Sequence, residues 1–462
     1  MSARFSARVP WPARLNSLAR LRERLLRSGE PLLDFSDSNP TRTGLTADCG
    51  RGGDWPLRLL ADPANLGYSP DPRGLGRARE ALASRYANLI LPRGRAPGAR
   101  DFFLCSSTSE AYSWLFKLLC DPGDAIMVPK PGYPLFDYLA ALESVETRGY
   151  RLGYAHPSGW RVDLDSVRDA MRDGKVRAIV VINPNNPTGS YIEPSERQAL
   201  AGLCAEGGCA LIADEVFFGY RLEGAGGGAS AAVTAAGGPA AAGPAAAAVT
   251  AAATATVAVA ATAVAAASTV VAAAGAAPGA AAPESCAGEQ ACLTFVLDGL
   301  SKLLGLPQMK LGWIACSGPR RELAEAAGRL EIIADSYLSA GAPPMNALPA
   351  LLEDAEDFAA RARERLSRNL GILRGILEGA DSPHRVLRCA GGWTALIESP
   401  RLASEEELAS GLLSEAGIWA QPGYFFDMER EAFFAASLIL RPEVMAEGAA
   451  RYARYFEVLQ QR

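Results

Sequence analysis

The chain alternates short apolar runs with longer stretches in which apolar residues recur at helical spacing. Such runs, bounded by turn residues, are typical of strands that are buried on both faces. They lie at residues 125–129 (AIMVP), 176–183 (VRAIVVIN), 209–216 (CALIADEV), 292–298 (CLTFVLD) and 311–317 (LGWIACS). Residues 109–120 and 193–207 show the helical spacing between them. This alternation predicts an α/β domain with a mostly parallel sheet.

Residues 224–283 interrupt the alternation. They include no charged residue and consist almost entirely of Ala, Gly, Thr, Val and Pro. A membrane span is disfavoured there, because the apolar part contains no Leu, Ile or Phe. We expect a low-complexity surface insert that is partly helical where Ala dominates.

Composition excludes several classes of function. The chain has 462 residues, with 46 Lys plus Arg against 51 Asp plus Glu, so it offers no basic field for nucleic acid or a membrane surface. Its nine cysteines are scattered without a C-x-x-C pair, and the N-terminal residues lack the apolar core of a signal peptide. Both features favour reduced thiols in the cytoplasm. With only His156 and His384, we expect no metal site and no Ser-His-Asp triad.

Polar residues at the ends of the predicted strands are the candidates for function, because ligands of such sheets collect there. Residues 105–112 (CSSTSEAY) follow a strand-like DFFL and open a helix. Thr108, Ser109 and the amide of Glu110 would then lie at a helix N-terminus, which favours a phosphate but also suits an ordinary cap. Asn186, in NPNNPTG, either points into the same cleft or belongs to a simple turn.

Two carboxylates and two lysines complete the candidates. Asp214 and Glu215 end a strand as apolar as CALIA, and a buried carboxylate is costly enough to demand a cationic partner. The stretch SKLLGLPQMKLGW (301–313) places Lys302 and Lys310 eight positions apart among apolar residues. Taken singly, each lysine also suits a surface side chain whose stem covers apolar groups.

Three motifs occur in a fixed order: N-P-x-N-P-T-G, D-E-V at a strand end, and S-K-x-x-G-L-P-Q-x-K-x-G-W. This ordered set resembles the class I/II aminotransferases of the fold type I pyridoxal-phosphate (PLP) superfamily, which are similar to aspartate aminotransferase. The resemblance runs from about Ser38 to the C-terminus and skips only the Ala-rich insert. It implies a large PLP-binding domain over 45–330 and a small α+β domain over 331–462, which the N-terminal segment 1–44 joins.

The resemblance also implies roles for individual residues. Lys302 would form the Schiff base with the cofactor and later move a proton, and a lysine held between apolar segments has the depressed pKa that a nucleophilic amine needs. Asp214 would pair with the pyridine nitrogen, Asn186 would donate to the phenolate oxygen, and Tyr133 would stack on the ring. Lys310 would bind the phosphate as a point charge. The remaining implied cofactor contacts are Ser107, Thr108, Ser109, Glu110 and Ser301.

Further positions follow the family pattern less closely. Tyr68 would reach the phosphate of a partner subunit in a homodimer, but it also suits a tyrosine packed on a turn. Asn39 would line the substrate pocket, but an Asn-Pro turn explains it as well. Arg441 is the candidate for the substrate carboxylate, although it lies about four residues late and also suits an exposed arginine. Phe217 stands where the family usually has a tyrosine.

The implied activity is transfer of an amino group between an amino acid and a 2-oxo acid by a ping-pong mechanism with pyridoxal 5'-phosphate. A PLP-dependent lyase or decarboxylase would use the same cofactor residues and differ only in its substrate contacts. A DNA-binding regulator with this fold is disfavoured, because roughly 35 residues before SDSNP are too few for such a module and a linker. The sequence carries no readable motif for the substrate side chain.

Overall fold

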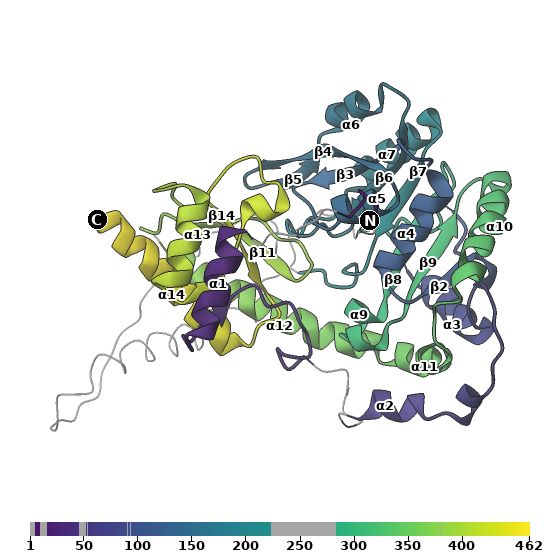
Figure 1. The fold of residues 1–462 in the computed structure, drawn as a ribbon, viewed down its shortest axis with the longest axis horizontal. Helices are drawn as coiled ribbons and strands as arrows, with labels where there is room; N and C mark the ends of the chain where they lie inside the picture. The colour runs from purple at the N-terminus through teal and green to yellow at the C-terminus, as the bar shows by residue number, and fades with distance from the viewer. Residues whose placement is uncertain are drawn as a thin grey trace, which may run out of the picture.

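The structure is a computed structural model that describes residues 5–9, 16–45, 52, 54–89, 91–92, 94–222, 283–379 and 381–462. The expected Ala-rich insert, residues 224–283, lies outside the described residues except for Pro283. Figure 1 shows a large sheet at the upper right, a smaller sheet at the left, and the long helix α12 running below both.

The large sheet has eight strands in the order β2-β9-β8-β7-β6-β3-β4-β5. Its central pairs β8–β7, β7–β6, β6–β3 and β3–β4 are parallel, while β2–β9, β9–β8 and β4–β5 are antiparallel. The prediction of a mostly parallel α/β sheet is therefore confirmed. In chain order the strands are β2 (Phe102–Cys105), β3 (Ala125–Lys130), β4 (Glu146–Ala155), β5 (Gly159–Val162), β6 (Val176–Ile182), β7 (Ala210–Asp214), β8 (Thr294–Gly299) and β9 (Gly312–Ser317).

Helices cover both faces of this sheet, because consecutive strand residues point to opposite sides. Along β7, Leu211 and Ala213 belong to one apolar core and Ile212 belongs to the other. The core that contains Ile212 is closed by α4 (Thr108–Leu119), α5 (Phe136–Leu142) and α10 (Arg320–Tyr337). The opposite core receives α3 (Gly76–Tyr86), α6 (Leu164–Met171) and α7 (Pro194–Gly207). Burial on both faces explains why these strands read as continuous apolar runs.

The smaller sheet is antiparallel, with the order β10-β11-β14-β13. A short parallel pair, β1 with β12, joins residues near the N-terminus to the C-terminal part of the chain. The strands are β1 (Leu33–Asp34), β10 (Arg385–Val386), β11 (Thr394–Glu398), β12 (Ile418–Trp419), β13 (Gln421–Pro422) and β14 (Phe433–Ser437). The helices here are α1 (Ser17–Arg27), α12 (Ala355–Leu377), α13 (Glu405–Ser414) and α14 (Pro442–Gln461).

The remaining elements among the described residues are three helices and four 3-10 helices. They are α2 (Trp55–Leu60), α9 (Leu300–Leu303), α11 (Ala342–Glu353) and the 3-10 helices η1 (Pro63–Leu66), η2 (Ala99–Asp101), η3 (Pro307–Met309) and η4 (Gly423–Phe426). Within the described part of the chain, no helix combines the length and apolar character needed to cross a bilayer. All eight cysteines that the described residues contain are free thiols.

Candidate active site

The start of α4 forms one wall of the candidate site. Ser107 caps the helix, and its Oγ accepts the backbone N–H of Glu110 at 3.2 Å. Within the described residues, the backbone N–H groups of Thr108 and Ser109 have no hydrogen-bond acceptor. A Cβ on Gly312 would lie 3.3 Å from both the Ser107 carbonyl carbon and the Thr108 nitrogen, so a larger residue would have to push this backbone away from β9. The result is a corner with two free amide donors at a helix N-terminus, which attracts anions.

Glu110 differs from the expectation for this corner. Its amide is used internally by the Ser107 cap and is not free for a ligand. Its carboxylate turns back to accept the Ser106 backbone N–H at 2.7 Å, the Ser106 hydroxyl at 2.8 Å and the Ser339 hydroxyl at 2.6 Å. Glu110 therefore ties the start of α4 to the segment after α10.

Asp214 lies at the end of β7, where the parallel strands also end. Its carboxylate accepts the Tyr112 hydroxyl at 3.1 Å and the Val216 backbone N–H at 3.2 Å. Burial raises the pKa of Asp214 to about 6, and its two hydrogen bonds and the charge of Lys302 only partly offset this rise. The site thus holds a buried acceptor that would gain from a cationic partner.

Lys302 is the last residue but one of α9 and points into the same region. Its Nζ lies 5.0 Å from the centroid of the Trp393 ring and 5.5 Å from that of Phe217. Desolvation lowers the pKa of Lys302, and the nearby charge of Asp214 opposes this effect. No hydrogen bond or ion pair to this Nζ occurs within the described residues. A half-buried amine with a lowered pKa and no hydrogen-bonding partner is suited to act as a nucleophile.

An aromatic cluster surrounds this amine. The Phe217 and Trp393 ring centroids are 5.3 Å apart, and the Tyr220 and Trp393 centroids are also 5.3 Å apart. The Tyr220 hydroxyl donates to the backbone carbonyls of Lys302 and Leu303, so it fixes the α9 backbone and leaves the lysine side chain free. Phe217, at the usual tyrosine position, faces the amine with a ring that has no hydroxyl.

The contacts of Glu215 differ from those expected from the sequence. A cationic partner was expected for it, but within the described residues it has none within ion-pair distance. Its carboxylate instead accepts the Ser285 hydroxyl at 2.5 Å, the Cys286 backbone N–H at 2.7 Å and the Asn183 amide at 3.3 Å. Burial raises the pKa of Glu215 to about 7 in spite of these bonds. Hydrogen bonds and protonation therefore replace the ion pair.

Tyr133 and Asn186 lie at the ends of two neighbouring strands, β3 and β6. Tyr133 is 38% exposed, and its ring meets Phe136 edge to face at 6.1 Å. Phe136 in turn contacts Tyr112 at 5.1 Å, so an aromatic path leads from Tyr133 to the hydroxyl that binds Asp214. Burial and the charge of Asp214 both raise the pKa of Tyr133. Asn186 is half-buried.

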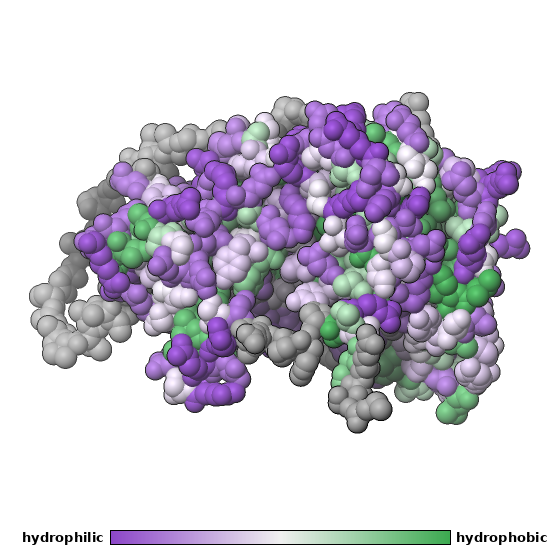
Figure 2. Space-filling model, turned by 45° about the horizontal axis from the view of Figure 1, so that its top comes forward, coloured by the Kyte–Doolittle hydropathy of each residue, from purple (hydrophilic) through white to green (hydrophobic). Residues whose placement is uncertain are grey.

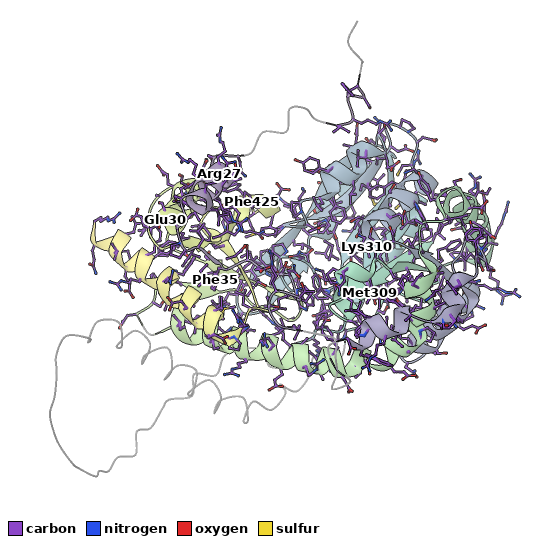
Figure 3. The ribbon with its side chains drawn as sticks, turned by 60° about the horizontal axis from the view of Figure 1, so that its bottom comes forward. Arg27, Glu30, Phe35, Met309, Lys310 and Phe425 are labelled. Atoms are coloured by element: carbon purple, nitrogen blue, oxygen red, sulfur yellow. The ribbon has the colours of Figure 1, made fainter. Side chains whose placement is uncertain are left out.

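Lys310 and Ser301 flank the lysine segment. Ser301 is half-buried in α9. Lys310 is exposed, ends η3 and adopts a left-handed backbone with φ of 51°. In Figure 3, Lys310 and Met309 lie on the side of the large sheet, opposite Phe35 and Phe425.

The other three candidates lie in less enclosed positions. Tyr68 is 84% exposed. Asn39 is half-buried, and its side-chain oxygen accepts the Thr41 hydroxyl at 2.7 Å and the Thr41 backbone N–H at 3.1 Å, which is the local turn also considered for it. The adjacent Pro40 does approach the lysine segment, because a Cβ on Gly305 would lie 3.2 Å from the Pro40 Cβ.

Arg441 caps the start of α14 with its side chain 61% exposed, and its Nε lies 3.7 Å from the Glu443 carboxylate. Its predicted contact with a substrate carboxylate stays a prediction.

Sequence analysis missed Tyr112 and Trp393. Tyr112 lies in a helix whose apolar spacing made it resemble a core residue, and Trp393 directly precedes β11 of the smaller sheet. A signal for Tyr112 existed, because it follows Thr108 by four positions and so shares its face of α4. No local signal could have linked Trp393 to Lys302.

Comparison with known proteins identifies the family. The sequence profile described as aminotransferase class I and II matches residues 56–450. The chain belongs to this family. Class I/II aminotransferases depend on PLP. Within the described residues, no group of three or more His, Cys, Asp or Glu side chains is arranged to hold a metal ion.

Curated relatives and solved structures agree with the family. A glutamate-pyruvate aminotransferase of Escherichia coli is 30% identical over 42% of this chain and 46% of its own length. An S-alkyl-thiohydroximate lyase of Arabidopsis thaliana is 30% identical over 40% of this chain and 39% of its own length. The chain thus spans less than half the length of these relatives. An alanine aminotransferase from Pyrococcus furiosus has a TM-score of 0.76 at 18% identity, covering 99% of this chain and 100% of that one. This last likeness confirms fold type I.

Proposed function

We propose that this family member transfers amino groups between amino acids and 2-oxo acids with PLP as its cofactor. The observation that carries the proposal is that Lys302 and Asp214 lie in one region and perturb each other's pKa. One is a half-buried amine with a lowered pKa, and the other is a half-buried carboxylate whose pKa is raised by desolvation. A pyridine ring that is protonated at its nitrogen would supply that cation, and its aldehyde would react with the amine.

The residues of the described site fit such a ligand. The free amides of Thr108 and Ser109, with the hydroxyls of Ser107 and Ser301 and the cation of Lys310, would hold the phosphate. Tyr133 would lie against the ring, and the Asn186 amide would donate to the phenolate oxygen. When bound, the cofactor supplies an electron sink for the carbanion that forms at the substrate Cα.

The chain itself would bind and move protons. Lys302 Nζ, whose pKa is lowered by desolvation, would remove the proton from the substrate Cα and deliver it to C4′ of the cofactor. Asp214, held by Tyr112 and Val216, would stay ionised once a cation faces it. Phe217 and Trp393 would exclude water from the amine, so that proton transfer does not compete with solvent.

Replacing Lys302 tests the proposal. Lys302→Ala is expected to abolish the visible absorbance of bound PLP and nearly all transamination, while PLP binds weakly through its phosphate. Lys117→Ala is the matched control. Lys117 lies on α4, away from the cofactor site, and forms an ion pair with Glu143. The assignment fails if the variant keeps the absorbance and borohydride fixes the cofactor to another lysine.

A PLP-dependent lyase or decarboxylase is the second candidate. The observation in its favour is the 30% identity to the Arabidopsis thaliana S-alkyl-thiohydroximate lyase. The two activities separate in a single half-reaction with an amino acid alone. Accumulation of pyridoxamine phosphate with a 2-oxo acid supports the aminotransferase, and release of carbon dioxide or a cleaved side chain supports the alternative.

We also propose a homodimer with shared sites. Tyr68 and Leu66 are 84% and 92% exposed beside a groove of ≈ 630 Å³, and Ile332 on α10 is 71% exposed. Large apolar side chains at such exposure are typical of a contact surface, and the surface in Figure 2 carries apolar areas among hydrophilic ones. Light scattering of the eluted protein should give twice the chain mass, and Ile332→Arg should lower it.

Localisation and domain limits complete the proposal. The eight free thiols support a reducing compartment, the cytoplasm. We place the large domain at 45–330 and the small domain at 331–462. Pairing of Leu33 with Ile418 supports the view that the N-terminal segment 1–44 joins the small domain.

A further inference from the structure

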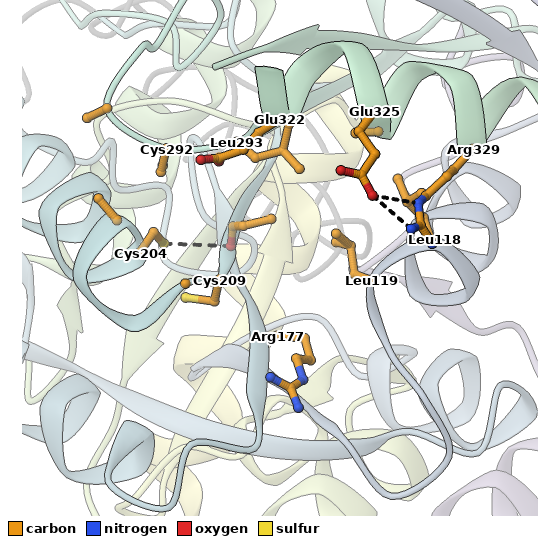
Figure 4. A pocket seen from close by; sticks show the side chains of 15 residues that line it. Leu118, Leu119, Arg177, Cys204, Cys209, Cys292, Leu293, Glu322, Glu325 and Arg329 are labelled. Carbon is orange, nitrogen blue, oxygen red and sulfur yellow. Dashed lines mark hydrogen bonds and ion pairs between the residues drawn. The ribbon is translucent and has the colours of Figure 1, made fainter. Parts of the chain in front are cut away.

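A cavity of ≈ 430 Å³ lies beside the ends of β7 and β8 that are remote from the lysine site. It is bordered by the C-terminus of α7, by the residues before β8 and by α10, as Figure 4 shows. Three of its lining residues are cysteines, Cys204, Cys209 and Cys292. The proposed amino-group transfer uses none of them.

The turn at the end of α7 brings two of these cysteines together. Gly208 has φ of 62°, and the Cys209 backbone N–H donates to the Cys204 carbonyl at 3.0 Å. This is the bonding pattern of a Schellman motif, in which the residues at these two positions commonly touch through their side chains. The bond keeps the two Cα atoms within about 7 Å, which is the limit for a disulfide. Helix termination therefore places two thiols within bridging reach.

The three thiols differ in their readiness to ionise. Cys204 lowers the pKa of Cys209 and the pKa of Cys292 by hydrogen bonding to both sulfurs, against the opposing effect of burial. The pKa of Cys204 itself is raised for the same reason, and the Ala210 carbonyl at 3.6 Å is an alternative acceptor for its single S–H proton. Cys209 is the more exposed of the two acidic thiols, at 7% against 2% for Cys292. Cys209 thus combines a lowered thiol pKa with a position in the lining of the cavity.

We propose that this cavity is a thiol oxidation site for hydrogen peroxide, with Cys209 as the attacking thiol and Cys204 as the resolving thiol. The Cys209 thiolate attacks one peroxide oxygen, an S–O bond forms, the O–O bond breaks, and the leaving hydroxide becomes water by taking up the proton that Cys209 released on ionising. The Cys204 sulfur then attacks the sulfur of Cys209. The S–S bond forms, the S–O bond breaks, and a second water leaves with the Cys204 proton. Two thiols are oxidised and one peroxide is reduced to two waters.

Distance separates this chemistry from amino-group transfer. Cys209 directly precedes β7, whose five residues end at Asp214. At the rise of a β-strand, the two ends lie roughly 15 Å apart. Oxidation at the cavity and loading of PLP can therefore be measured independently of each other.

Peptide mapping of the peroxide-treated holoenzyme tests the assignment. Trypsin cleaves after Arg197 and Arg221, so Cys204 and Cys209 occupy one peptide and Cys292 another. We expect the 198–221 peptide to lose two hydrogens without cross-linking and to recover them with dithiothreitol. Cys204→Ser should accumulate a sulfenic acid at Cys209 that dimedone traps. Cys209→Ser should abolish the loss of two hydrogens from this peptide.

The control is Cys316→Ser, because Cys316 is buried in the sheet core and does not line the cavity. It should leave the oxidation rate unchanged. If Cys209→Ser does not fold, the dimedone adduct of Cys204→Ser decides alone. A disulfide between Cys204 and Cys292, a dimedone adduct on another cysteine, or an unmodified 198–221 peptide would each overturn the proposal.

Discussion

Asp214→Asn should stabilise the protein without cofactor at alkaline pH while it disables the proposed chemistry. Burial raises the pKa of Asp214 to about 6 from an ordinary value of 3.8. The folded state thus binds the Asp214 proton more tightly than the unfolded state, so protonation favours folding. That contribution is complete below about pH 4 and is lost as the pH rises through 6. Asparagine has no charge, its side-chain oxygen can still accept the Val216 backbone N–H, and its NH2 group can donate to the Tyr112 hydroxyl oxygen.

The size of the effect follows from the pKa difference. Two units correspond to about 3 kcal/mol in the free energy of unfolding above pH 7. In a chain of this length, that is an increase of about 3 °C in Tm. The assay is thermal unfolding of the cofactor-free protein from pH 4 to pH 8. The surface variant Asp169→Asn, whose side chain is 61% exposed, controls for the general effect of removing a carboxylate.

Adding PLP should reverse the order of stability. The carboxylate gains a cation only in the wild type, so PLP should raise the Tm of the wild type more than that of Asp214→Asn. A difference in Tm that is the same at pH 4 and pH 8 would refute the reasoning about burial. An equal gain from PLP in both proteins would refute the pairing of Asp214 with the ring.

Three further predictions follow from particular side chains. Phe217→Tyr should lower the pKa read from the visible absorbance of bound PLP by on the order of one unit, because a hydroxyl donor would be added to the phenolate region; an unchanged or raised titration contradicts this. Arg441→Ala should change KM for any amino donor by less than about twofold, since its side chain is 61% exposed and near Glu443; a tenfold rise would make it the carboxylate contact. Replacing residues 226–282 with a short Gly-Ser linker should leave a folded, PLP-loaded protein. Arg221 and Pro283, which flank the deleted segment, line one cavity, so a short linker can join the two ends, and removing a long loop changes the closure entropy little. Loss of PLP absorbance would show that the segment is required.

Strand positions could be predicted because both faces of the sheet are buried. Each apolar run coincided with a strand to within two residues, as for residues 176–183 and the observed Val176–Ile182. The order of the strands in the sheet was harder to predict. The antiparallel insertion of β9 between β2 and β8 depends on pairing between segments some 210 positions apart, which carries no local signal.

Some residues of the candidate site could likewise be predicted from the sequence, and others could not. Lys302 and Asp214 could be predicted because their motifs are local, and the structure places both in one buried region. The amide of Glu110 could not be assessed from sequence, because whether a helix cap uses it depends on the rotamer of Ser107. Trp393 approaches the lysine only through the packing of the smaller sheet against the larger one. Contacts of that kind arise from tertiary structure alone.

The pairing of β1 with β12 has a consequence for biosynthesis. Leu33 and Ile418 are partners although about 385 positions separate them. A ribosome adding 5 to 20 residues per second needs roughly 20 to 80 s to synthesise the intervening chain. During that interval the N-terminal segment, which carries Asn39 and Pro40, has no strand partner. The wall that Pro40 forms beside the lysine segment is therefore completed only when nearly the whole polypeptide has emerged, so nascent chains should need protection from aggregation until then.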